Sequence, residues 1–241
     1  MLRELASRTR DSALQVPKVI YSGKWQGHEA LLLAPLDGRG RTPHRAANVP
    51  VAASLVLAEV RRQTIERLGN STFWERIRRR IEQLVPFLSE QNRQLVLRSR
   101  DLVEVCWGDT LLPTGQSHGD WIPPNMVIRS DGTYSVWDWE RSATDTPLGV
   151  DTMQFLIYLA LRQRRPSWEP NGHFAHMART ALTRLGLNPS HSTLLTILSL
   201  LQTLLWYAEA RESGREADEA GREERDAGRF AHSLAAILEQ R

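Results

Sequence analysis

Cysteine and lysine are both scarce in this sequence. The 241 residues include one cysteine, Cys106, which excludes an intrachain disulfide framework and a cysteine-rich metal site. Such usage is typical of a reducing compartment, so we expect a cytoplasmic location. Lys18 and Lys24 are the two lysines among 31 cationic residues, and the arginines are interspersed with acids. The net charge of +3 therefore does not indicate nucleic-acid binding.

Long apolar runs are also lacking. The longest, 194–207, is interrupted by four polar residues, so we expect no segment to span a membrane. The first residues do not have the pattern of a signal peptide. With 41% hydrophobic and 24% charged residues, the chain is expected to bury a sizeable core as one domain or two modest lobes.

The first 36 residues differ from the remainder. A short helix is expected over 2–12, and a β-hairpin from the strands 17–21 and 29–33. After a breaker cluster the pattern becomes helical, with apolar residues at helical spacing in 52–68, 72–88, 151–164, 174–185, 193–210 and 230–240. The acidic segment 209–229 is expected to be a solvated loop or a weak helix.

The segment 111–148 interrupts this helical pattern and is rich in proline, glycine, aspartate and tryptophan. Two short β-prone runs within it, 126–129 and 134–137, flank a four-residue turn that contains Asp-Gly. They are therefore expected to form a hairpin with its turn at 130–133.

That register places Asn125 opposite Asp138, at the open end of the hairpin. Opposed residues have Cβ atoms about 4.5–5.5 Å apart, so an amide oxygen and a carboxylate are expected to meet there. A small set of oxygen ligands suits Mg²⁺. Asp120 reaches the same end on a loop that contains Pro123 and Pro124, and a carboxylate beside such a metal can accept a hydroxyl proton. The geometry predicts a phosphoryl-transfer site.

The motifs HGDWIPPN at 118–125 and DWE at 138–140 resemble those of the aminoglycoside phosphotransferase and choline kinase family. This resemblance implies a protein-kinase-like fold, Mg²⁺ as cofactor, and transfer of a γ-phosphoryl group from ATP or GTP to a hydroxyl of a small molecule. It also assigns roles to five residues: Asp120 is the catalytic base, Asn125 and Asp138 are the metal ligands, and His118 and Asp151 support the catalytic loop.

The start of the chain is similar to the last part of the family's N-terminal lobe. The resemblance implies that Leu33, Ala34 and Leu36 form a hinge that contacts the nucleotide base. The expected fold is α+β and mostly helical, with a protein-kinase-like C-terminal lobe and a truncated N-terminal lobe of one helix and a β-hairpin. The expected domains are 1–36, the remnant of the N-terminal lobe, and 37–241, the helical lobe with catalytic loop 117–125 and metal hairpin 125–140.

The sequence departs from the family at the elements that hold the nucleotide phosphates. In the family a phosphate-covering loop and a strand lysine precede the helix that would contain Glu4, whereas both lysines here follow it. The true start could lie upstream, the chain could be a truncated remnant, or a partner could supply the missing half. We therefore expect the chain alone to be a poor or inactive kinase.

Two other functions stay open. A non-catalytic kinase-like binding module, or a truncated remnant, would fit the absent lysine, although decay should first remove the Asp120, Asn125 and Asp138 set. Metal-dependent phosphoester hydrolysis could use the same oxygens, although such sites usually carry more carboxylate or histidine ligands. The acceptor is not defined by the sequence: because acids and arginines are mixed, an aminoglycoside is not favoured over a sugar, an amino alcohol or another metabolite.

Overall fold

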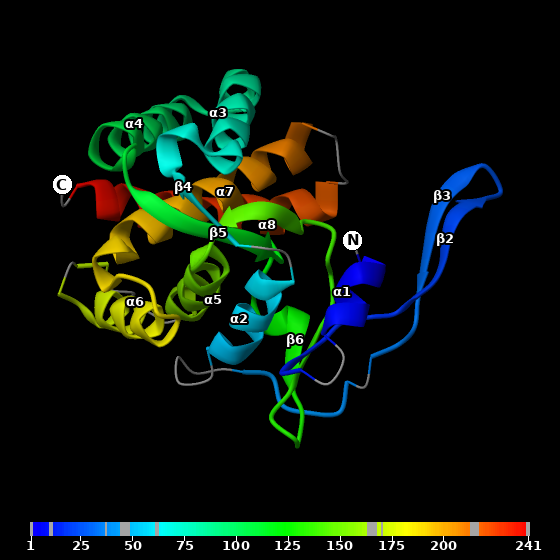
Figure 1. The fold of residues 1–241 in the computed structure, drawn as a ribbon. Helices are drawn as coiled ribbons and strands as arrows, with labels where there is room; N and C mark the ends of the chain where they lie inside the picture. Colours follow the sequence, from blue (N-terminus) through cyan, green and yellow to red (C-terminus); the bar gives the residue numbers. More distant parts are fainter. Residues whose placement is uncertain are drawn as a thin grey trace.

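The computed structural model describes residues 2–9, 12–36, 38–43, 49–60, 63–162, 168–169, 171–212 and 217–239, without the side chains of 211 and 217–226. The helices within these residues are α1 (Leu2–Arg8), α2 (Val51–Glu59), α3 (Thr72–Leu84), α4 (Glu90–Trp107), α5 (Val150–Leu161), α6 (His173–Arg184), α7 (Ser192–Glu212) and α8 (Ala217–Leu238). The strands are β1 (Leu14–Gln15), β2 (Val19–Trp25), β3 (His28–Leu33), β4 (Thr64–Arg67), β5 (Leu111–Ser117), β6 (Met126–Ile128), β7 (Tyr134–Val136) and β8 (Ala143–Pro147). The fold is therefore mixed α/β and mostly helical, as expected (Figure 1).

The strands form three small sheets, in the orders β1-β7-β6, β2-β3 and β4-β5-β8. Strand β1 runs parallel to β7, with Leu14 opposite Tyr134. Arg41 also forms an antiparallel bridge with Ile128 on the other side of the same sheet. The beginning of the chain thus shares a sheet with the expected metal hairpin, and the domain division at residue 36 stays a prediction.

Strands β2 and β3 form a ribbon that extends away from the helical body (Figure 1). The expected hairpin is present, but its turn contains only Gln26 and Gly27, at φ 49° and 85°. Two successive residues with positive φ are typical of a type I′ turn, which matches the twist of the strands. The ribbon leaves large apolar side chains exposed, among them Ile20, Trp25 and Leu31.

Helix α7 lies at the centre of the helical part, where it packs against α3, α4, α5, α6 and α8. Its apolar stretch, Pro189–Ala210, is longer than the run noted in the sequence and is long and apolar enough to cross a membrane by length and composition alone. Because 72% of its most apolar 18-residue window is buried inside the fold, α7 has the environment of a core helix.

Two sequence-based assignments of helix need correction. The helix expected over 52–68 ends at Glu59, and Thr64–Arg67 forms strand β4 instead, paired with β5. That pairing is a long-range contact, which the local helical spacing of apolar residues could not reveal. In the acidic segment 209–229, α7 continues to Glu212 and the backbone from Ala217 onward is helical.

The hairpin of β6 and β7 forms where the sequence predicted it, but its register differs by one residue. Ile128 lies opposite Tyr134 and Met126 opposite Val136. The loop is shorter than expected because Gly132, at φ +83°, donates to the Arg129 carbonyl and closes a three-residue turn. The expected pairing of Asn125 with Asp138 is therefore wrong.

Candidate active site

The segment after β5 is organised around the buried side chain of His118. Its Nδ1 accepts a hydrogen bond from the Asp120 backbone N–H at 3.2 Å, and its Nε2 lies 2.9 Å from the Trp137 carbonyl oxygen. Burial lowers the pKa of His118 to about 4, so the ring is neutral near pH 7 and donates from Nε2. The imidazole thus ties the loop to the end of the β6–β7 hairpin.

Asp151, in the first turn of α5, holds the same loop from the other side. Its Oδ2 accepts from the His118 N–H at 2.7 Å and its Oδ1 from the Gly119 N–H at 3.1 Å. Burial raises the pKa of this carboxyl to about 6. Gly119 is needed at φ +82°, because a Cβ there would lie 2.3 Å from the Arg141 carbonyl oxygen.

Asp120 and Asn125 contact each other directly. The Asn125 amide donates to the Asp120 Oδ2 at 2.8 Å and to its backbone carbonyl at 3.1 Å. Arg141 Nη1 lies 3.3 Å from Asp120 Oδ1. Burial raises the pKa of Asp120, while Arg141 and Asn125 oppose this shift and the nearby charges of Asp138 and Glu140 add to it. The carboxylate is thus a stronger base than one in water, held by two donors.

Asp138 lies one residue beyond the expected ladder pair. The Trp137 N–H donates to the Asn125 carbonyl at 3.1 Å, and the chain then turns at Asp138, whose φ is +67°. This left-handed conformation is uncommon for a residue other than glycine, although aspartate adopts it more readily than most. The side chain of Asp138 is exposed. The sequence thus correctly placed Asp138 at the open end of the hairpin near Asp120, but it did not predict the turn of the backbone at this residue.

The donor set of these residues fits Mg²⁺. Within the described part of the chain, neither the Asn125 Oδ1 nor the Asp138 carboxylate makes a hydrogen bond or an ion pair. No group of three or more His, Cys, Asp or Glu side chains able to hold a metal gathers among the described residues. An amide oxygen plus a carboxylate is nevertheless a set that Mg²⁺ uses, because this ion keeps several waters and binds substrate phosphates.

The three expected hinge residues lie at the end of β3 and directly after it. Leu33 is the last residue of β3, opposite Val19, and the Ala34 N–H donates to the Lys18 carbonyl at 2.8 Å. Ala34 and Leu36, but not Leu33, line a cavity of about 420 Å³ together with Lys18 and Ala6 of α1. The structure does not bring these residues into the cavity that contains Asp120.

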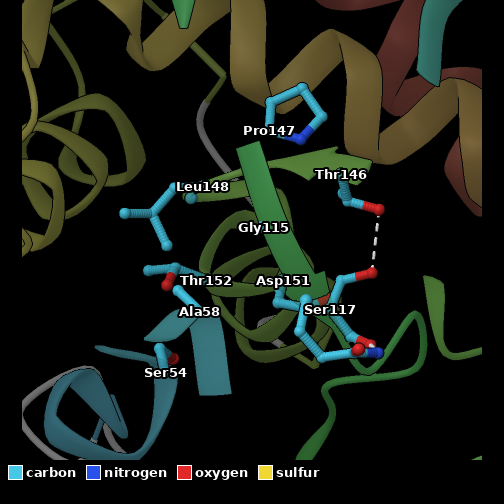
Figure 2. A pocket seen from close by; sticks show the side chains of 11 residues that line it. Ser54, Ala58, Gly115, Ser117, Thr146, Pro147, Leu148, Asp151 and Thr152 are labelled. Carbon is cyan, nitrogen blue, oxygen red and sulfur yellow. Dashed lines mark hydrogen bonds between the residues drawn. The ribbon is translucent and has the colours of Figure 1, made fainter. Parts of the chain in front are cut away.

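A small cavity of about 10 Å³ lies behind Asp151, between α2, α5, β5 and β8 (Figure 2). Ser54 and Thr152 line it, and their buried hydroxyl oxygens have no hydrogen-bond partner among the described residues. The Ser117 hydroxyl at the same cavity is paired with that of Thr146 at 2.8 Å.

This difference gives a prediction for two hydroxyl deletions. Ser54→Ala removes no hydrogen bond and is expected to change the free energy of unfolding by less than about 0.5 kcal/mol. Ser117→Ala leaves the Thr146 hydroxyl unpaired and should lower it by about 1 kcal/mol. Urea unfolding of both variants measures this. An equal loss in Ser54→Ala would contradict the prediction and would mean that a water bonds its hydroxyl.

Two residues of the candidate site, Gln154 and Arg141, were not identified from the sequence. Gln154 accepts from the Trp121 N–H at 2.7 Å and donates to the Gly119 carbonyl at 3.2 Å. Its position could have revealed it, because it is a polar residue one turn after Asp151 in an apolar helix. Arg141 has no comparable signal, since nothing in the sequence distinguishes it from the other arginines.

The fold that brings these three residues together is protein-kinase-like. One solved structure that shares the fold is the ADP-bound aminoglycoside phosphotransferase APH(2'')-Ib, with a TM-score of 0.53 over 98% of this chain and 81% of that chain. The two sequences are 12% identical. No family model matches the chain, and no curated protein matches it by sequence.

Proposed function

We propose that this protein is a cytoplasmic small-molecule phosphotransferase, which moves the γ-phosphoryl group of ATP or GTP to a substrate hydroxyl. The proposal depends on one observation, the convergence of Asp120, Asn125 and Asp138. Asn125 bonds the carboxylate of Asp120, and the charge of Asp138 raises the pKa of the same carboxyl. The shared fold of a protein that binds ADP supports nucleotide use.

In the reaction, Asp120 accepts the proton of the acceptor hydroxyl. The hydroxyl oxygen forms the new bond to the γ-phosphorus, the bond to the β–γ bridging oxygen breaks, and the nucleoside diphosphate leaves with that oxygen. Arg141, 3.3 Å from Asp120, favours the ionised carboxylate that can take the proton. Phosphoryl transfer needs little more from the protein than such positioning and charge.

Asn125 and Asp138 would hold Mg²⁺ through their oxygen atoms. The bound ion would neutralise charge on the nucleotide phosphates. The exposure of Asp138 and its lack of partners among the described residues leave its carboxylate available for this role. Leu33, Ala34 and Leu36 are proposed to contact the nucleotide base, in the region of the cavity that Ala34 and Leu36 line.

The test is calorimetric titration of the full chain with ATP and with GTP, with and without Mg²⁺. We expect Mg²⁺-dependent binding that is weakened at least about tenfold by Asp138→Ala. Asp131→Ala is the matched control, because Asp131 is an exposed aspartate in the turn of the same hairpin, and its removal should leave binding unchanged. If folded protein binds neither nucleotide, the catalytic proposal fails and the binding-module or remnant alternative is favoured.

A further inference from the structure

A cavity of about 590 Å³ opens beside the catalytic loop, with Asp120 in its wall. The remaining walls come from Ile122 and Arg141, which lie in loops, and from α5, with Arg162 just beyond its end, α7 and α8, which are far apart in the sequence. Tyr158, Tyr207 and Phe230 supply aromatic surface. Because the cavity reaches the carboxylate proposed to take the acceptor's proton, its lining determines which acceptors fit.

The charge of this lining is mostly positive. Three of the described lining residues are arginines, Arg141, Arg162 and Arg229, whereas Asp120 is the single carboxylate among them. Arginine presents five N–H donors in a planar fork that matches phosphate and carboxylate groups. A polycationic acceptor would need the opposite lining.

Arg141 is fixed in place between the base and an aromatic ring. Its guanidinium carbon lies 3.3 Å from the centre of the Trp206 ring, and its Nη1 lies 3.3 Å from Asp120 Oδ1. Its Nε is buried and has no hydrogen-bond partner among the described residues, since the Glu140 carboxylate is 4.0 Å away. Asp120 therefore pairs with only some of the N–H donors of Arg141.

Arg162 is held differently, at the end of α5. Its Nη1 contacts the Tyr158 hydroxyl at 2.5 Å, and its guanidinium lies 5.4 Å from the centre of the same ring. Within the described residues it pairs with no carboxylate. Its charge is thus available to a molecule in the cavity.

We propose that the acceptor is an anionic hydroxyl compound, such as a sugar carrying a phosphate or a carboxylate. Its hydroxyl faces Asp120, and its anionic group is bound by Arg162 and Arg229. This substrate class rests on the proposed function, because the cavity is an acceptor site only if Asp120 is the base. It differs from the cationic substrate named for the structural neighbour APH(2'')-Ib.

The test compares four glucose-derived compounds by calorimetry on the full chain, without nucleotide: glucose 6-phosphate, gluconate, glucose and glucosamine. We expect one or both anionic compounds to bind at least about tenfold more tightly than glucose, and glucosamine to bind most weakly. The comparison of glucose 6-phosphate with gluconate shows whether a phosphate or a carboxylate is preferred. Added salt should weaken the binding of the two anionic compounds and leave the binding of the others unchanged.

Variants then locate the binding. Arg162→Gln and Arg229→Gln are each expected to weaken the anionic ligand about tenfold to a hundredfold, as for hydrogen bonds to charged groups. Arg79→Gln is the control, because Arg79 is an exposed arginine of α3 that does not line the cavity. Circular dichroism checks that each variant is folded.

Three results overturn the proposal. Glucose or glucosamine binds as tightly as the anions, or Arg79→Gln weakens binding as much as Arg162→Gln. The third is that glucose 6-phosphate, gluconate and inorganic phosphate all fail to bind at millimolar concentration. The nucleotide titration is independent of these measurements. Mg²⁺-dependent nucleotide binding without preference for anions would reject the substrate class and leave the phosphotransferase proposal in place. The reverse pattern would reject phosphoryl transfer and leave an anion-binding cavity.

Discussion

Asp120→Asn is expected to lower the rate of phosphoryl transfer about 10²- to 10⁴-fold, the usual contribution of a positioned general base. Asparagine has the same shape as aspartate but cannot accept the proton of the acceptor hydroxyl. The burial that raises the pKa of Asp120 makes the wild-type carboxylate a better base, so its removal should lower the rate substantially. Binding of the metal–nucleotide complex should be unchanged, because Asp120 is not one of the proposed metal ligands.

The measurement is the release of nucleoside diphosphate at high protein concentration, with and without a hydroxyl compound that binds the cavity. High protein concentration allows slow turnover to be detected. Asp131→Asn serves as the control, since Asp131 is exposed and interacts with Thr133 and Arg129 of its own hairpin. An Asp120→Asn variant that turns over at the wild-type rate would show that another group, or none, takes the proton.

The second large effect is expected at Asp151. Asp151→Ala removes the acceptor of two buried backbone N–H groups, those of His118 and Gly119. An unpaired buried donor costs about 1–3 kcal/mol, so we expect a loss of about 3 kcal/mol in the free energy of unfolding. Asp101→Ala, which deletes an exposed aspartate paired with Arg100, should cost less than about 1 kcal/mol. Urea unfolding distinguishes the two.

The pH dependence of stability tests the same residue independently. The folded pKa of about 6 lies above the ordinary 3.8, so between these values the folded state holds a proton that the unfolded state has released. The contribution of Asp151 is therefore fully present below about pH 4 and is lost as the pH rises through about 6. Two pKa units correspond to on the order of 2–3 kcal/mol.

Asp151→Asn has no proton to release, so the stability advantage of the wild type over this variant should shrink from pH 4 to pH 7. Both proteins share every other titrating group, and the difference between their unfolding curves isolates residue 151. Parallel pH profiles for the two proteins would contradict the assignment of a raised pKa to Asp151.

The sequence by itself determined several of the regular helices, although not α4, and the location of the candidate site. Apolar residues at helical spacing predict α5, α6 and α7 within a few residues, because such a face must be buried somewhere whatever its partner is. The loop that contains Asp120 and the hairpin that ends near Asp138 were also located, because proline, glycine and short β-prone runs act locally.

The tertiary structure alone decided what depends on distant contacts. Strand β4 exists because β5 pairs with it, and β1 joins the hairpin sheet although more than a hundred residues separate Leu14 from Tyr134. The register changed by one residue because Gly132 closed a shorter turn. Arg141 became the partner of Asp120 because its loop folds against Trp206 of α7. Arg162 and Arg229 gathered around the same cavity through the packing of α5, α7 and α8. Charge composition along a chain is the same whether arginines scatter or converge, so the sign of the charge around the cavity beside Asp120 could be read only from the fold.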